Sequence, residues 1–321
     1  MWWTKHFQIS NIPDLSGKIA IITGSNTGIG KLCATEMARK NCEIIVASRS
    51  EDKGQAAVTD IKSATGNQKV EYMKLDLMSL KSVKAFADQF KSKYDKLDIL
   101  LNNAGVMSCP YGLSEDGIET QFATNHVGHY YLTMQLLPIL IKSGPSRIVN
   151  VSSMAHWSTT VSVPKLEQVS QKKGYNATIQ YGFTKVPFTI SIFEACNILF
   201  SRELTKRLES KGINNVYVNC NHPGIVSSEL SRHVVAQNTL LDSLYNNHFA
   251  ISTENGSLTQ LYLATSPEIE SKNIKGQYYV PYARPGWFTP YARSEKNATD
   301  LWEFTENLLK EKMPDYQGSP I

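Results

Sequence analysis

Short apolar stretches alternate along the chain with longer stretches in which apolar residues recur every three or four positions. The short stretches are almost continuously apolar and rich in β-branched residues, which is typical of strands in a parallel sheet covered on both faces. Six of them span residues 18–23, 43–48, 70–75, 97–101, 147–152 and 216–220. The segments between them are long enough for helices, as in residues 79–94, where Ser79 is the expected N-cap. The pattern predicts an α/β protein with a doubly wound parallel sheet of the Rossmann type.

The rest of the chain fits one domain. A last strand at residues 276–281 and a helix at residues 298–312 complete the pattern, with no linker, repeat or low-complexity segment. We therefore expect an N-terminal tail at residues 1–16 and a single catalytic domain at residues 17–315. Trp2, Trp3 and Phe7 of the tail can either touch a lipid surface or pack on the domain, and packing is the favoured interpretation.

Composition excludes several classes of protein. The chain is 41% apolar and 19% charged, as in ordinary soluble globular proteins. A net charge of +4 is too small to indicate a nucleic-acid partner. The five cysteines are odd in number and include no C-x-x-C pair, which argues against disulfides and a metal site and favours a reducing, cytoplasmic compartment. With no run of about 18 apolar residues, no transmembrane span is expected, while peripheral contact with an intracellular membrane stays open.

A glycine-rich loop lies between the first strand and the first helix. Its sequence is TGSNTGIG, residues 23–30. Gly24 permits a tight turn, Gly28 lets the backbone approach a pyrophosphate, and Gly30 allows the helix to pack closely on the strand. The free N–H groups at the start of the helix then favour phosphate, so the loop predicts a dinucleotide site.

Three motifs, in this order along the chain, resemble those of a known protein family. G-x-x-x-G-x-G at residues 24–30, NNAG at residues 102–105 and Y-x-x-x-K at residues 181–185 resemble the short-chain dehydrogenase/reductases. Stretches 124–133, 147–156 and 221–230 are most similar to the retinol-dehydrogenase-like branch. The resemblance implies an NAD(P)-dependent oxidoreductase. It assigns cofactor binding to Gly24, Ser25, Thr27, Gly28, Ile29, Gly30, Asp76, Leu77, Asn103, Ala104, Gly105, Tyr181, Lys185, Pro223, Gly224 and Ile225.

Arg49 bears on which dinucleotide binds. Enzymes that prefer NAD usually carry an acid at the end of the second strand, where it binds the ribose 2′-hydroxyl. Here that strand is followed by Arg49, whose guanidinium suits a 2′-phosphate, while Glu51 and Asp52 are expected to start the next helix. We therefore expect NADP(H) to be preferred over NAD(H). The alternative is that Arg49 is a solvated loop charge.

The resemblance also implies a catalytic set of Asn125, Ser153, Tyr181 and Lys185. Residues four apart lie on one face of a helix, so Tyr181 and Lys185 can point into one cleft. An ammonium group lowers the tyrosine pKa from about 10, which allows proton exchange with the substrate oxygen. Ser153 would bind that oxygen, with Ser152 buried in the strand end, and Asn125 would anchor a water that links Lys185 to solvent.

The helix after Lys185 departs from the family pattern. The matching asparagine is Asn197, twelve residues past Lys185 instead of three, so residues 186–194 are an insertion. Pro187 clashes with the carbonyl of Phe183, and we expect the helix to break just after Lys185. The insertion could loop over the site, contact a partner subunit, or be a translated fragment that the mature chain lacks. Because this helix forms the dimer in many relatives, a homodimer stays open.

The expected substrate is a small lipophilic alcohol, aldehyde or ketone. Residues 228–255 follow the proline–glycine motif and carry many apolar side chains, which favour a lipophilic pocket. The alternative is a helix that packs its apolar stripe on the sheet. A second function is also open, namely a catalytically impaired NAD(P)-binding regulatory or scaffold protein, because the insertion interrupts the catalytic helix.

Overall fold

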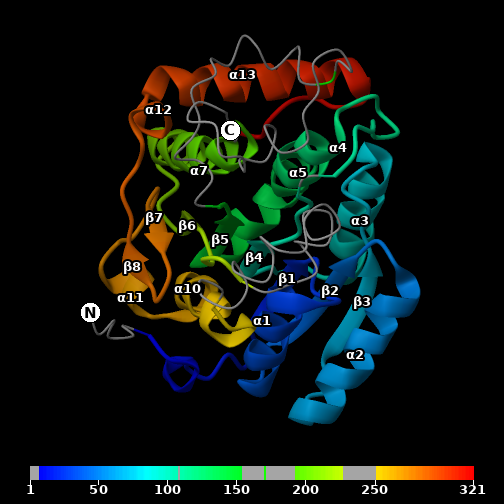
Figure 1. The fold of residues 1–321 in the computed structure, drawn as a ribbon, viewed down its shortest axis with the longest axis vertical. Coiled ribbons are helices and arrows are strands. Elements are labelled where there is room, and N and C mark those ends of the chain that lie inside the picture. The colour runs from blue at the N-terminus through cyan, green and yellow to red at the C-terminus, as the bar shows by residue number, and fades with distance from the viewer. Residues whose placement is uncertain (1–6, 108, 154–169, 171–191, 227–250) are drawn as a thin grey trace, which may run out of the picture.

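A single eight-stranded sheet runs through the computed structural model, which describes residues 7–107, 109–153, 170, 192–226 and 251–321. The strand order is β3-β2-β1-β4-β5-β6-β7-β8 (Figure 1). The strands are β1 (Ile19–Thr23), β2 (Glu43–Ser48), β3 (Val70–Lys74), β4 (Ile99–Asn102), β5 (Ser146–Val151), β6 (Val216–Asn221), β7 (Tyr278–Val280) and β8 (Arg284–Pro285). All neighbours pair in parallel except β7 and β8. The chain reverses its direction of winding between β1 and β4, which makes this the topological switch point.

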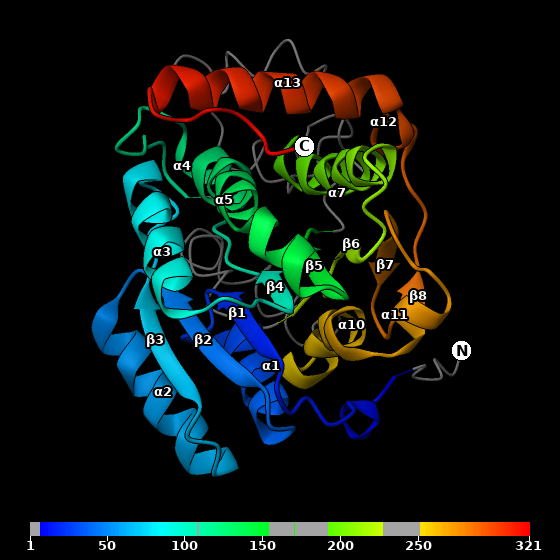
Figure 2. The same ribbon diagram turned by 180° about the vertical axis from the view of Figure 1, so that it is seen from behind.

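Helices cover both faces of the sheet (Figures 1 and 2). They are α1 (Gly28–Arg39), α2 (Glu51–Thr65), α3 (Leu80–Lys93), α4 (Thr120–Phe122), α5 (Gly128–Ser143), α7 (Ile192–Ser210), α10 (Thr253–Thr265), α11 (Glu268–Ser271), α12 (Pro290–Arg293) and α13 (Glu295–Lys312). Successive residues of β1 point to opposite faces: Ile21 joins the core with α3, α5 and α7, whereas Ala20 and Ile22 join the core with α1, α2 and α10. This is why the strands read as continuous apolar runs.

The predicted doubly wound α/β fold is confirmed. Each predicted strand lies within two residues of its observed bounds, and the last helix begins three residues earlier than predicted. The hydroxyl of Ser79 accepts a hydrogen bond from the N–H of Ser82 at 3.3 Å, so the predicted N-cap is also confirmed. The antiparallel strand β8 was not predicted because its two residues are too few to show a periodicity.

The described part of the N-terminal tail packs on the domain. Phe7, Ile12 and Leu15 are buried in the core beneath α1 and α10, and the Phe7 ring meets Tyr262 edge-on with centroids 5.6 Å apart. Phe7 therefore faces the protein rather than lipid, while Trp2 and Trp3 lie outside the described residues. No helix in the described ranges is both long and apolar enough to cross a bilayer.

Helix α7 begins inside the predicted insertion. Its first three residues, 192–194, belong to the segment predicted as an insertion after a helix break, but they are helical and continuous with the rest of α7. Residues 186–191 lie outside the described ranges. Two side chains then hold α7 against β5: Asn197 donates to the carbonyl of Val151 at 2.9 Å, and the amide of Asn150 donates to the hydroxyl of Ser201 at 2.9 Å. These bonds fix which face of α7 meets the sheet.

Helix α13 packs on α7 and completes the core on the face of the sheet that α3, α5 and α7 cover (Figure 1). Its buried Glu306 accepts hydrogen bonds from the hydroxyls of Tyr130 on α5, at 2.7 Å, and Tyr316 in the C-terminal segment, at 2.5 Å. The N–H of Ser319 donates to the same carboxylate at 3.0 Å. The C-terminal segment is thus bonded to α13 directly and linked to α5 through the shared carboxylate of Glu306.

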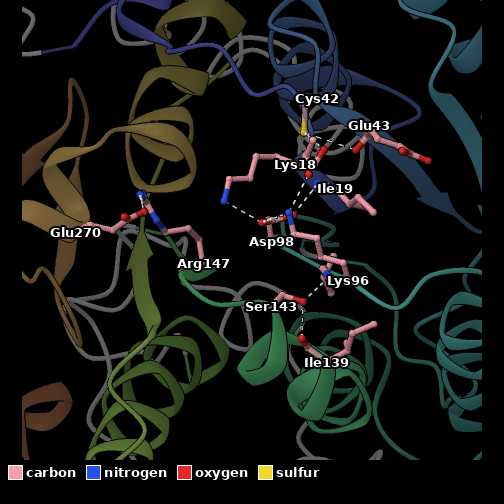
Figure 3. A network of polar contacts seen from close by, with 12 residues as sticks. Lys18, Ile19, Cys42, Glu43, Lys96, Asp98, Ile139, Ser143, Arg147 and Glu270 are labelled. Carbon is pink, nitrogen blue, oxygen red and sulfur yellow. Dashed lines mark hydrogen bonds and ion pairs between the residues drawn. The ribbon is translucent and has the colours of Figure 1, made fainter.

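A buried carboxylate joins β1 to β4 at the edge of the sheet where these strands begin. Asp98 is 1% exposed and accepts hydrogen bonds from the N–H of Ile19, at 3.0 Å, and from Lys18, at 2.9 Å. Lys96 completes an ion pair with it at 3.2 Å (Figure 3). Since a buried charge is stable only when it is paired and hydrogen-bonded, this cluster compensates the burial of Asp98.

We expect Asp98→Asn to lower the free energy of unfolding by about 1–3 kcal/mol, because the two lysines lose their shared buried anion. The measurement is urea denaturation followed by circular dichroism. Asp88→Asn is the matched control, since Asp88 also pairs with two lysines, Lys84 and Lys91, but is half exposed. The control should cost less than about 1 kcal/mol. Equal losses in the two variants would contradict the role assigned to burial.

Candidate active site

A cavity of about 390 Å³ opens at the carboxyl ends of the parallel strands, at the switch point between β1 and β4. In open α/β sheets this is where ligands bind. Twelve of the residues predicted to bind cofactor line it. They are Gly24, Thr27, Gly28, Ile29, Gly30, Arg49, Asp76, Leu77, Asn103, Ala104, Gly105 and Pro223. The structure thus brings together segments that lie far apart in the sequence.

The glycine loop and the NNAG turn are in direct contact. A Cβ on Gly24 would lie 2.9 Å from the Cα of Ala104, and Gly24 also has a φ of +66°. A Cβ on Gly30 would lie 2.4 Å from the side-chain nitrogen Nδ2 of Asn103 and 2.7 Å from the backbone carbonyl oxygen of Gly24. Both positions therefore require glycine, one for backbone conformation and closeness, the other for closeness alone.

The first turn of α1 leaves its N–H groups available to a ligand. Thr27 is the N-cap residue, yet its side chain makes no capping hydrogen bond. An uncapped helix N-terminus at a cavity favours an anion such as a phosphate. Ser25 is fully buried instead and donates to the carbonyl of Ile22 at 2.6 Å, while its neighbour Asn26, which was not predicted, lines the cavity.

The end of the cavity beside β2 carries positive charge. Arg49 directly follows β2, is exposed, and makes no hydrogen bond or ion pair with any described residue. Ser50 caps α2, which starts at Glu51 as predicted, and Lys53 in the first turn of α2 also lines the cavity. Lys53 was not predicted, because its place in the cavity follows from where α2 begins and not from a motif.

Asp76 lies after β3 on the same side. One of its carboxylate oxygens accepts the N–H of Met78 at 3.0 Å, and its own N–H donates to the hydroxyl of Ser82 at 3.0 Å. These bonds fix the turn that places Asp76, Leu77 and Met78 in the cavity wall. The carboxylate keeps acceptor capacity for a ligand amino group.

The described catalytic candidates come from β5 and from the turn before α5. Ser152 is buried beyond the end of β5, as expected, and its N–H donates to the Asn221 carbonyl at 2.6 Å, whereas Ser153 is half-buried. Neither Ser153 nor Asn125 is among the residues that line the cavity. Tyr181 and Lys185 lie outside the described residues.

Asn125 sits in a π-helical turn, η2 (Ala123–Val127), just before α5. Such turns occur often at functional sites. Its side chain is 5% exposed and bonds twice to the backbone of Val106, accepting from the N–H and donating to the carbonyl, both at 2.9 Å. The side chain of Asn125 is thus committed to the loop that follows the NNAG turn.

The proline–glycine motif follows β6. Pro223 lines the cavity, but Gly224 and Ile225 do not. Gly224 has a φ of +91°, and its N–H donates to the ring of His222 at 3.0 Å. The carbonyl of Ile225 accepts from the N–H of Ile251. The apolar stretch predicted to shape a substrate pocket falls mostly in residues 227–250, outside the described part of the chain.

Several lining residues were not predicted. They are Thr23, Asn26, Ala47, Ser48, Ser50, Lys53, Leu75, Met78, Val106, Met107, Thr120, Thr124 and Val151. Most of them adjoin a predicted motif residue or end a strand, so the carboxyl ends of the predicted strands were the signal that could have found them. Among the described residues, no group of three or more histidine, cysteine or acidic side chains could hold a metal ion.

Known proteins share this architecture. The family model for short chain dehydrogenase matches residues 18–164. Retinol dehydrogenase 12 of Mus musculus is 39% identical over 295 residues, which cover 92% of this chain and 87% of that protein. Retinol dehydrogenase 13 of Homo sapiens is 36% identical over 313 residues, which cover 96% of this chain and 89% of that protein.

Solved structures agree with these sequence matches. A protein from Mycobacterium paratuberculosis superposes with a TM-score of 0.73 at 30% identity, over 95% of this chain and 97% of that one. A short chain dehydrogenase from Shigella flexneri, complexed with NADP, superposes with a TM-score of 0.60 at 20% identity, over 83% and 98%, and shares the fold. The glycine loop, the NNAG turn and the extent of these matches show that the chain belongs to the short-chain dehydrogenase/reductase family, in its retinol-dehydrogenase-like branch, and is an oxidoreductase acting on CH–OH groups.

Proposed function

We propose that the protein is an NADP(H)-dependent oxidoreductase that transfers hydride between the nicotinamide and a lipophilic alcohol, aldehyde or ketone. The observation that supports the choice of cofactor is the pair of cations at the β2 end of the cavity. Arg49 is free of protein partners among the described residues, and Lys53 lies in the same wall. A guanidinium and an ammonium beside a capped helix start suit a dianionic 2′-phosphate better than a ribose hydroxyl.

The other lining residues would hold the rest of the cofactor. The first turn of α1 would bind the pyrophosphate through the N–H groups of Gly28, Ile29 and Gly30. Asp76 would accept a hydrogen bond from the adenine amino group. When bound, the nicotinamide supplies or accepts the hydride.

We assign proton transfer to Tyr181, with Lys185 beside it and Ser153 on the substrate oxygen. Asn125 would anchor a water that links Lys185 to solvent, and its own side chain is held in place by two hydrogen bonds to Val106. Hydride transfer and proton transfer then balance: reduction of a carbonyl consumes one hydride at carbon and one proton at oxygen.

Lipophilic substrates are supported by the apolar part of the cavity wall, which includes Val106, Met107 and Val151. The relatives named retinol dehydrogenase 12 and 13 agree with that class. All five cysteines are buried and none forms a disulfide, which supports a reducing, cytoplasmic setting. Peripheral contact with an intracellular membrane stays part of this proposal.

A homodimer, if it forms, would use another surface than α5 and α7, because α13 and the C-terminal segment cover these helices. This arrangement differs from the pairing through the catalytic helix that the family resemblance implies.

We expect Tyr181→Phe to lower the rate of NADPH oxidation by a factor of about 10² to 10⁴, because the phenol is the proton donor to the substrate oxygen. The measurement is absorbance at 340 nm with a panel of lipophilic aldehydes and ketones. The dissociation constant for NADPH should stay within about twofold, since the variant removes one hydroxyl. Turnover by the variant within tenfold of the wild type would contradict the assignment.

A variant without residues 186–194 tests the alternative function. If the full chain binds NADPH without turnover and the shortened chain turns over, the insertion impairs catalysis and the full chain fits the regulatory interpretation. Turnover by the full chain that Tyr181→Phe abolishes would exclude that interpretation.

We expect Arg49→Gln to raise the KM for NADPH by about 10- to 100-fold while leaving the KM for NADH within about twofold, because only the 2′-phosphate loses a charged partner. Steady-state kinetics with both cofactors is the measurement. Lys69→Gln removes an equal charge outside the cavity and serves as the control. A wild-type preference for NADH would overturn the proposal for the cofactor.

A further inference from the structure

His129 is a buried histidine that the proposed chemistry does not use. It lies in the first turn of α5 and is 2% exposed. Its Nε2 is 2.9 Å from the hydroxyl oxygen of Thr23, the last residue of β1. Its Nδ1 is 3.4 Å from the main-chain carbonyl of Asn125, one turn earlier. One side chain thus connects the strand before the glycine loop with the turn that carries a catalytic candidate.

The hydrogen bonds of Thr23 determine which ring nitrogen of His129 carries the proton. The N–H groups of Asn103 and Ala104 both donate to the Thr23 hydroxyl oxygen at 2.9 Å, which uses its two lone pairs. The hydroxyl hydrogen must then donate elsewhere. Nε2 of His129 is 2.9 Å away, whereas the Leu101 carbonyl is 3.5 Å away, so His129 is the better acceptor.

His129 therefore accepts at Nε2 and, when neutral, carries its hydrogen on Nδ1, directed at the Asn125 carbonyl. Burial lowers the pKa of His129 to about 4, and the hydrogen bond to Asn125 opposes that shift. The ring is consequently neutral near pH 7, as the acceptor role at Nε2 requires.

We propose that His129 is a positioning residue that closes a ring of hydrogen bonds under the bound cofactor. The ring runs from His129 to Thr23, from Thr23 to Ala104, along the backbone to Val106, from Val106 to the side chain of Asn125, and from the Asn125 carbonyl back to His129. Thr23, Ala104 and Val106 line the cavity. His129 fixes the relative places of the glycine loop, the NNAG turn and Asn125. This role rests on the proposed cofactor binding.

Two substitutions separate the two ring nitrogens. His129→Gln keeps a polar group near the position of Nε2 and can accept from Thr23, whereas His129→Asn keeps a donor near the position of Nδ1 and cannot reach Thr23. His129→Phe removes both. His126→Phe is the control, because His126 is 1% exposed on the neighbouring turn, with its Nε2 3.1 Å from the hydroxyl of Thr305 on α13.

The experiment uses the full chain. Long-range ¹⁵N–¹H NMR on histidine-labelled protein identifies the His129 signals as those missing in His129→Gln, and we expect the Nδ1–H tautomer. NADPH titration should give a dissociation constant within about twofold of the wild type for His129→Gln, and about tenfold higher for His129→Phe and His129→Asn. His126→Phe should lower the melting temperature about as much as His129→Phe but leave NADPH affinity within about twofold.

A hydrogen on Nε2 would overturn the proposed ring, and so would equal losses of NADPH affinity in His129→Phe and His126→Phe. If His129→Phe does not fold, the contrast between Gln and Asn decides in its place. If the wild type binds neither NADPH nor NADH, the proposed function fails, and the tautomer alone then decides whether the ring of hydrogen bonds exists. The tautomer of His129 distinguishes failure of the ring from failure of cofactor binding, because it reports the hydrogen bond between Thr23 and His129 without any cofactor.

Discussion

The contact between the glycine loop and the NNAG turn is the constraint on which the rest of the site depends. No atom larger than hydrogen fits on Gly24 or Gly30 without displacing the turn or the loop. Because β1 and β4 are neighbours in the sheet, this contact lies at the switch point, where the helices on either side diverge and leave a cavity. The uncapped start of α1 and the cations Arg49 and Lys53 then face that cavity from one side, and β5 ends on the other.

Side-chain hydrogen bonds join β1 and β4 at both ends of these strands. The buried Asp98 holds β1 and β4 together where they begin, as Figure 3 shows, and Thr23 joins them where they end. The same two strands are thus pinned at both ends by side chains that bond to backbone groups. Asn197 and Ser201 hold α7 against β5 through hydrogen bonds to the Val151 carbonyl and the Asn150 side chain, so this helix keeps a definite orientation on the sheet.

Much of the fold and part of the site could be predicted from the sequence. The continuous apolar runs predicted the strands of a doubly wound sheet, and the glycine motif predicted a dinucleotide site, since each depends on local pattern. Lys53 and His129 could not be predicted, because their roles depend on where a helix starts or on which side chains meet in the core. Ser25 shows the converse: the motif assigns it to the cofactor, yet its hydroxyl bonds to the backbone of Ile22. Motifs give positions along the chain, whereas side-chain direction follows from packing.

The attachment of the C-terminal residues has a consequence for how the chain folds as it is made. Tyr130 and Tyr131 of α5 are covered by Glu306 and Tyr316, which leave the ribosome long after them. Until then the outer faces of α5 and α7 have no partner and are exposed to chaperones and to other nascent chains. A chain that ended before α13 would therefore keep every described residue of the cofactor cavity but lack one side of its core.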